Sequence, residues 1–237
     1  MRFGIEIEFT GVSRKEAAKA IADELNTEYI YEQYQGKAGR SRRYRIVDDL
    51  GQSWCLVRDF SIHRNIRGIP TDEAEYGCEL VSPVIHSTTM LGKILQSLKK
   101  IGATVNESCG CHVHMDAPEP KTLYSIMEKF FTIQDRVVKE FDIPEYRVQN
   151  YCKLYTDDFV SGFKSLENRG MSDIQDYVYN TLAPEEDRGW RKNSARYYAI
   201  NIDSIYKRNT LEFRLFNSTL DVGVIGNYLY FIRDLAG

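Results

Sequence analysis

The sequence has no long apolar run. No stretch reaches the roughly 18–20 apolar residues that a membrane-spanning helix needs. The first residues, Met1 to Gly4 followed by Glu6 and Glu8, lack the apolar segment of a signal peptide. We therefore expect a cytoplasmic protein with no membrane partner.

An overall positive charge is also missing. The net charge is −3 and the isoelectric point is about 5.9, so no general field attracts nucleic acid or an anionic membrane. The one dense basic run is Lys37–Arg45, next to Tyr34. Such runs are usually solvated hairpin tips, although this one could also grip nucleic acid or a polyanionic partner. We expect no nucleic-acid partner, and the role of the run stays open.

Cysteine and proline are sparse, with five and six residues among 237. The cysteines are odd in number, and the chain has enough apolar residues to fold without disulfides, so we expect reduced thiols. The low proline content and a hydrophobic fraction of 43% are typical of globular proteins, so we do not expect the chain to be disordered. The length favours one domain with room for an inserted subdomain.

What is present is a mixture of alternating and helical apolar patterns, which predicts an α+β fold. Range 142–195 lacks strand alternation and is predicted to be a helical insertion or lid. The hydrophobic periodicity predicts strands at 2–10, 28–34, 44–48, 53–59, 77–82, 197–203 and 210–216, two more within 103–116, and helices at 13–25, 88–101, 121–140 and from about 221. Strands 28–34 and 44–48 should form a hairpin around the polar stretch 35–43.

Acidic and imidazole side chains recur at two-residue spacing in the predicted strands. Side chains two apart share one face of a strand, so Glu6 and Glu8 lie side by side, as do His112, His114 and Asp116. Two adjacent carboxylates repel each other unless one is protonated or a hard cation lies between them. A solvated edge strand and a pair of core histidines are the simpler explanations of the two motifs.

Two further strands carry acids. Glu79 lies in a short apolar strand, where an unpaired carboxylate is costly. Glu212 and Arg214 point to one side of another strand, which could be an ordinary ion pair. Together these acids exceed what one sheet normally tolerates without metal, and the combination predicts a metal-lined sheet.

Six segments in this order carry a family resemblance: Gly4-Ile5-Glu6-Ile7-Glu8, Trp54 with Asp59-Phe60-Ser61, Glu79-Leu80-Val81-Ser82-Pro83, Gly110-Cys111-His112-Val113-His114, Arg196 with Asn201, and Thr210-Leu211-Glu212-Phe213-Arg214. As a set they resemble the amidoligase family of carboxylate–amine ligases, and more distantly glutamine synthetase and glutamate–cysteine ligase. The resemblance implies one catalytic domain over 1–237. Its curved antiparallel sheet would carry helices on the convex face and a helical insertion at about 142–195.

The resemblance further implies an ATP-dependent ligase that forms an amide or isopeptide bond through an acyl phosphate. Arg214 and Arg196 would act on the transferring phosphoryl group, and both would bind the nucleotide with His114. Asp59, as a catalytic residue, and Asn201, also near the nucleotide, would orient the amine or the carboxylate. Five residues would hold two or three Mg²⁺ or Mn²⁺ ions: Glu6, Glu8, Glu79, His112 and Glu212.

One position departs from the glutamine synthetase pattern. Thr210 stands where that enzyme has an arginine two residues before its glutamate, and Lys207 or Arg208 could replace it. The chain ends at Gly237, soon after the last predicted helix. This leaves open a missing C-terminal element, or a pocket closed by a second subunit in a homo-oligomer.

Three alternatives stay open. Cys109, Cys111, His112 and His114 could form a zinc knot, although structural zinc usually takes ligands spaced by two to four residues. A Cys–His hydrolase would need a distant partner, because residues 111 and 112 face opposite ways. A catalytically inactive relative could bind a peptide or a nucleotide. The sequence does not identify the carboxylate or the amine.

Overall fold

The chain folds into an α+β structure. The computed structural model describes residues 1–36, 39–183 and 194–237, and the side chains of 34–41 lie outside the description. Of the basic run Lys37–Arg45, the structure describes the side chains of residues 42–45 only, and among these Arg43 and Arg45 both form ion pairs with Glu32. The contacts divide the chain into two compact units. The N-terminal unit comprises Arg2–His112 and Asn217–Tyr228, and the C-terminal unit comprises Val113–Phe216 and Leu229–Gly237 with Met1.

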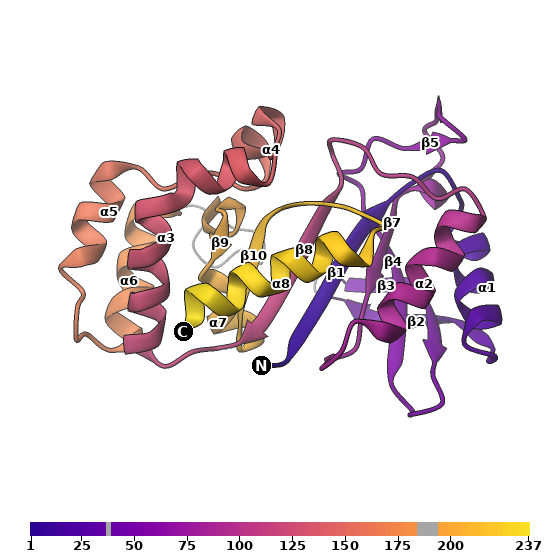
Figure 1. Cartoon of the computed structure of the whole chain (residues 1–237), viewed down its shortest axis with the longest axis horizontal. Helices are drawn as coiled ribbons and strands as arrows, with labels where there is room; N and C mark the ends of the chain where they lie inside the picture. Colours follow the sequence, from indigo (N-terminus) through magenta and orange to yellow (C-terminus); the bar gives the residue numbers. More distant parts are fainter. Residues whose placement is uncertain (37–38, 184–193) are drawn as a thin grey trace. The chain divides into compact units, whose positions relative to one another are not determined.

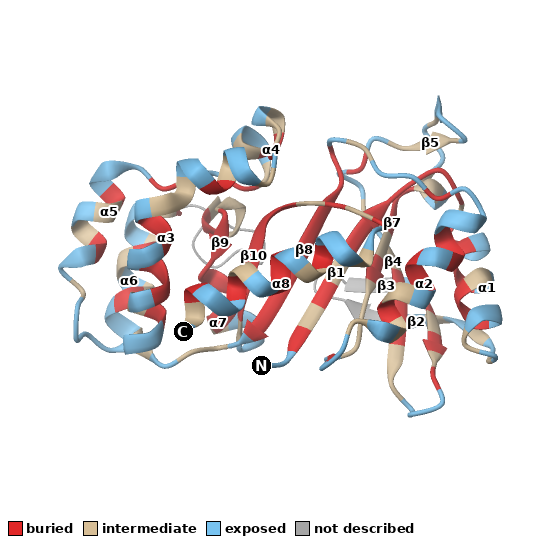
Figure 2. Ribbon diagram, viewed as in Figure 1, coloured by how far each residue is buried: buried red, intermediate tan, exposed pale blue. Residues whose placement is uncertain are grey.

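The N-terminal unit is built on an antiparallel sheet (Figure 1). Its strands are ordered β2 (Tyr29–Gly36), β3 (Gly39–Val47), β4 (Ser53–Arg58), β7 (Cys78–Val81) and β1 (Phe3–Phe9). A small separate hairpin pairs β5 (Asn65–Ile66) with β6 (Ile69–Pro70). On β1 the odd-numbered side chains Phe3, Ile5, Ile7 and Phe9 are all buried, which confirms the predicted alternation (Figure 2).

Two helices accompany this sheet. Helix α1 (Arg14–Glu24) begins at Ser13, whose side chain accepts from the Glu16 backbone N–H while Glu16 accepts from the Ser13 backbone N–H. This is the capping box that the sequence predicts. Helix α1 contacts α2 (Thr89–Lys100), β3 and β4. Gly102 follows α2 at φ +96°, a left-handed conformation that suits glycine and ends the helix as predicted.

The C-terminal unit combines a small sheet with most of the helices. The strand order is β8 (Gly110–Asp116, from Val113 on), β10 (Thr210–Asn217) and β9 (Ile200–Asn201). Among the described residues its helical segments are α3 (Pro120–Glu140), α4 (Glu145–Asn150), α5 (Asp157–Lys164), α6 (Met171–Leu182), η3 (Ser194–Tyr197), α7 (Asp203–Arg208) and the end of α8 (Val222–Ala236). An aromatic cluster joins α3 to α5, where the Phe131 ring meets Tyr155, Phe159 and Phe163 edge to face.

Three sequence expectations need correction. Only one strand forms within 103–116, because Thr104 makes an isolated bridge to Thr10 and the following turn is fixed by Asn106. Strand 197–203 shrinks to Ile200–Asn201, since η3 precedes it and α7 begins at Asp203. The hairpin strands extend through most of the supposed loop 35–43, pairing as far as Gly36 opposite Gly39.

Range 142–195 contains α4, α5 and α6, and residues 184–193 lie outside the description. Its assignment as an insertion or lid of a single domain stays a prediction. Within the described parts of the chain, no helix has both the length and the apolar character needed to cross a bilayer.

Candidate active site

Three carboxylates meet on the sheet of the N-terminal unit. Glu8, Asp59 and Glu79, here called the carboxylate cluster, each offer an oxygen within 4.8 Å of the others. Glu8 on β1 lies directly opposite Glu79 on β7 in the antiparallel register. Glu8 is buried, and the other two are half-buried. Three anionic groups this close repel one another unless a proton or a cation lies among them.

His112 joins this group from β8. Its Nδ1 lies 3.3 Å from Glu6 Oε2, and its Nε2 lies 3.8 Å from Glu8 Oε1. The Gly110 backbone N–H donates to Glu8 Oε2 at 2.6 Å, so the β8 backbone orients this carboxylate. The structure therefore brings four of the five predicted metal ligands together within one unit, with Glu212 in the other unit.

Asp59 is the member whose placement the sequence reasoning missed. The resemblance implies that Asp59 orients a substrate, whereas the structure places its carboxylate beside Glu8 and Glu79. The strand register contains the signal: Val57 on β4 lies opposite Glu79, and Asp59 is two residues further on the same face. Asp59 Oδ1 accepts from the Ser61 backbone N–H at 2.6 Å and from its hydroxyl at 2.5 Å.

A second polar group lies in the C-terminal unit around Glu212. Arg214 Nη1 donates to Glu212 Oε1 at 2.5 Å, and Asn201 Nδ2 donates to Glu212 Oε2 at 2.6 Å. Asn201 on β9 lies opposite Glu212 on β10, so strand pairing creates the second contact. All three residues are buried. Both oxygens of Glu212 therefore already accept a hydrogen bond, although each can still offer a lone pair.

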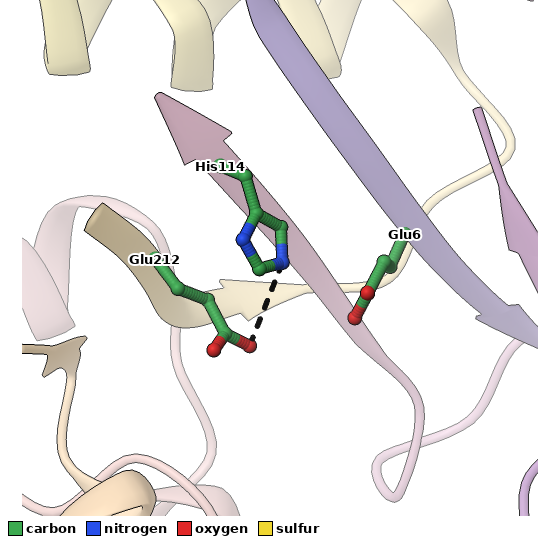
Figure 3. A group of neighbouring side chains, drawn as sticks. All are labelled: Glu6, His114 and Glu212. Carbon is green, nitrogen blue, oxygen red and sulfur yellow. Dashed lines mark ion pairs between the residues drawn. The ribbon is translucent and has the colours of Figure 1, made fainter. Parts of the chain in front are cut away.

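His114 borders the same group. Its Nε2 lies 3.9 Å from Glu212 Oε1, the ion pair dashed in Figure 3. Its Nδ1 lies 3.0 Å from the hydroxyl of Thr210, the position at which the resemblance to glutamine synthetase leads one to expect arginine. Lys207, one candidate to replace that arginine, makes an ion pair with Asp203 at 2.6 Å.

Two groups in this unit can receive a ligand. Asn201 Oδ1 is buried and accepts no hydrogen bond from any residue that the structure describes, because the amide faces Glu212 with its nitrogen. Arg196 is half-buried, and its guanidinium lies 5.3 Å from the Tyr197 ring centroid. Within 1–36, 39–183 and 194–237, no carboxylate forms an ion pair with Arg196. A guanidinium with no ion pair, and an amide oxygen with no hydrogen bond, among the described residues suit an anionic ligand and an N–H-bearing ligand respectively.

The cysteine thiols belong to neither of these clustered sets among the described residues. All five are buried and reduced. Burial raises the pKa of the Cys78 and Cys152 thiols, which disfavours the thiolate that binds metal or attacks a substrate. In the part of the chain that the structure describes, no clustered set of three metal-ligand side chains includes a cysteine.

Comparison with known proteins identifies the family of this chain. No curated protein matches the chain at a significant level. One family model does match, over residues 1–236, and its description is "Putative amidoligase enzyme". Because the match spans essentially the whole sequence, the chain belongs to this amidoligase family.

Proposed function

We propose that this amidoligase is an ATP-dependent carboxylate–amine ligase that uses Mg²⁺ or Mn²⁺. The observation that carries the proposal is the carboxylate cluster, whose three oxygens lie within 4.8 Å of one another. The proposal includes a sheet curved as in glutamine synthetase. A small or peptide carboxylate and an amine are the proposed substrates, and a homo-oligomer and a cytoplasmic location are compatible with it.

The donor set fits a hard divalent ion. Glu8, Asp59 and Glu79 supply oxygen, which Mg²⁺ and Mn²⁺ prefer, and His112 adds a nitrogen that Mn²⁺ accepts. Glu6 touches His112 and is the fifth candidate. Glu212 stays a candidate for a further ion. When bound, the metal neutralises phosphate charge, which is the main requirement of phosphoryl transfer.

The proposed reaction has two steps. A carboxylate oxygen of the first substrate attacks the γ-phosphorus of ATP, the bond to the bridging oxygen breaks, and ADP leaves. The amine nitrogen then attacks the acyl carbon, phosphate leaves, and the nitrogen loses a proton as the amide forms. Both steps need positioned cations and hydrogen-bond partners more than a protein nucleophile.

The residues of the C-terminal unit supply such groups. Arg196 would bind the phosphates, since no described carboxylate pairs with it. Glu212 fixes the orientation of Arg214, whose guanidinium would stabilise the transferring phosphoryl group. Asn201 Oδ1 would accept an N–H of the amine, and His114, held by Thr210, would lie near the nucleotide.

Thermal unfolding with and without ATP and Mg²⁺ tests the proposal before the substrates are known. A ligand at a hundred times its Kd stabilises by about 2.7 kcal/mol, a measurable rise in Tm. The shift should disappear in Glu79→Gln and persist in Glu73→Gln, a nearby exposed acid whose side chain makes no cap hydrogen bond.

The second stage measures ADP release with panels of carboxylates and amines. Release that requires both substrates supports the ligase. A Mg²⁺-dependent Tm shift without release from any pair would instead favour an inactive relative that binds nucleotide. If saturating ATP and Mg²⁺ leave the Tm of the folded parent unchanged, the ATP-dependent function is wrong.

A further inference from the structure

The main chain approaches itself closely next to the carboxylate cluster. Gly77 precedes β7, Asp59 follows β4, and the Asp59 backbone N–H donates to the Gly77 carbonyl oxygen at 3.3 Å. A Cβ atom placed on Gly77 would lie 2.3 Å from the Asp59 carbonyl oxygen. Real Cβ atoms do not approach another heavy atom this closely, so any side chain at 77 must displace Asp59.

The backbone conformation at position 77 does not itself require a glycine. Gly77 has φ −91° and ψ 97°, which every L-residue adopts readily. Arg64 Cδ and the Asp59 carbonyl carbon both lie 3.5 Å from the same Cβ position, an ordinary contact distance, and the Arg64 side chain is flexible. The Asp59 carbonyl is different, because it moves only if the backbone that carries the Asp59 carboxylate moves.

The carboxylate of Asp59 is held by Ser61. Its N–H and hydroxyl both donate to Oδ1, which limits rotation of the carboxylate. Gly77 thus sets where the Asp59 backbone lies, and Ser61 sets how its carboxylate is turned. Metal sites depend on such supporting contacts, whose loss typically lowers metal affinity by about 10–100-fold.

We propose that Gly77 is a positioning residue of the metal site: its missing side chain lets Asp59 approach Glu8 and Glu79 closely enough to share one ion. The inference rests on the proposed function, because it assumes that the carboxylate cluster binds Mg²⁺ or Mn²⁺. Gly77 itself contacts neither ion nor substrate.

The test is Mn²⁺ binding by calorimetry and electron paramagnetic resonance, which needs no substrate. Gly77→Ala should weaken Mn²⁺ binding by about 10–100-fold. The matched control is Gly226→Ala on α8 in the same unit, where an added Cβ meets nothing within 4 Å. That variant should bind Mn²⁺ as the parent does.

A variant pair separates positioning from general damage. Asp59→Ala should itself weaken binding, and adding Gly77→Ala to it should cause no further loss, because the displaced carboxylate is already gone. A full further loss in the Asp59→Ala background would overturn the proposal. So would a Gly77→Ala protein that binds Mn²⁺ like the parent, or one that fails to fold, since the glycine would then serve the fold alone. A folded parent that binds no Mn²⁺ would overturn the metal site of the proposed function as well.

Discussion

Arg214 and Glu212 form a buried ion pair on β10, with Nη1 2.5 Å from Oε1 and side chains only 7% and 3% exposed. The two-residue spacing places both on one face of the strand, and Asn201 adds a hydrogen bond from β9. An exposed pair of this kind contributes little to stability. A buried pair behaves differently, because removing one partner leaves a charge without compensation in a poorly solvated site.

Arg214→Met should therefore destabilise the chain by about 3–5 kcal/mol in urea unfolding, because Glu212 would stay buried without its cation. The double variant Glu212→Gln, Arg214→Met should lose less free energy of unfolding than the sum of the losses in the two single variants, because no buried charge is then left without its partner.

The control pair is Lys19 and Asp23, also close at 2.6 Å but with side chains 66% and 64% exposed. Asp23→Asn should cost no more than about 0.5 kcal/mol. Additive losses at 212 and 214 would contradict the argument.

His112 provides a second prediction, at the carboxylate cluster. Its imidazole lies near both Glu6 and Glu8, so His112→Ala should lower Mn²⁺ affinity by about 10–100-fold in calorimetric titration, whether it is a ligand or an orienting neighbour. His86→Ala serves as the control, because His86 is exposed and belongs to no clustered set of metal-ligand side chains among the described residues. Equal Mn²⁺ affinity in the two variants would remove His112 from the site.

The sequence predicts an element well when residues within that element determine it, as in a helix cap or an alternating strand. Ser13 and Glu16 define the start of α1, and the alternation of β1 defines its buried face. One expected strand near Thr104 does not form, because a turn follows its isolated bridge. The strand expected at 197–203 is shortened to Ile200–Asn201, because Tyr197 belongs to a 3₁₀ helix. Propensity is a weak guide when such tertiary contacts compete.

The site is only partly readable from sequence. Glu6, Glu8, Glu79 and His112 stand out because each lies on a strand with a visible period. Asp59 lies just beyond a strand, and its approach to Glu79 depends on the register between β4 and β7, which no local pattern specifies. The close approach at Gly77 likewise becomes visible only when both backbones are placed.

Tyr155 provides a prediction about alkaline pH. Its hydroxyl donates to the Ile200 carbonyl at 2.5 Å, and complete burial raises the pKa of the phenol well above its ordinary 10, with Tyr198 adding to the shift. A folded-state pKa above the unfolded one contributes stability that is fully present below about pH 10 and is lost as pH rises toward the folded value.

Tyr155→Phe should cost about 1 kcal/mol of stability at pH 7 and should remove the dependence of stability on alkaline pH that Tyr155 causes. The free energies of unfolding of parent and variant, measured from pH 7 to 11, should therefore converge at the alkaline end; a constant difference would contradict the assignment.

Acid pH should weaken the start of α1. The Ser13 hydroxyl and then its backbone N–H lower the pKa of Glu16 below its ordinary 4.5. A lowered folded-state pKa contributes stability above the unfolded value of 4.5 that is lost as pH falls through the folded one. Ser13→Ala should cost about 1 kcal/mol at pH 7, measured by urea unfolding. It should cost less at an acid pH low enough to protonate Glu16, because protonation removes the carboxylate that accepts from the Ser13 hydroxyl. Thr156→Ala at the start of α5 is the control: Thr156 accepts from the Phe159 N–H, and no carboxylate occupies that third position. Its cost should be similar at pH 7 and should change little with pH, because the cap it removes contains no titrating partner. If Ser13→Ala also cost the same at both pH values, the Glu16 carboxylate would have no part in the cap.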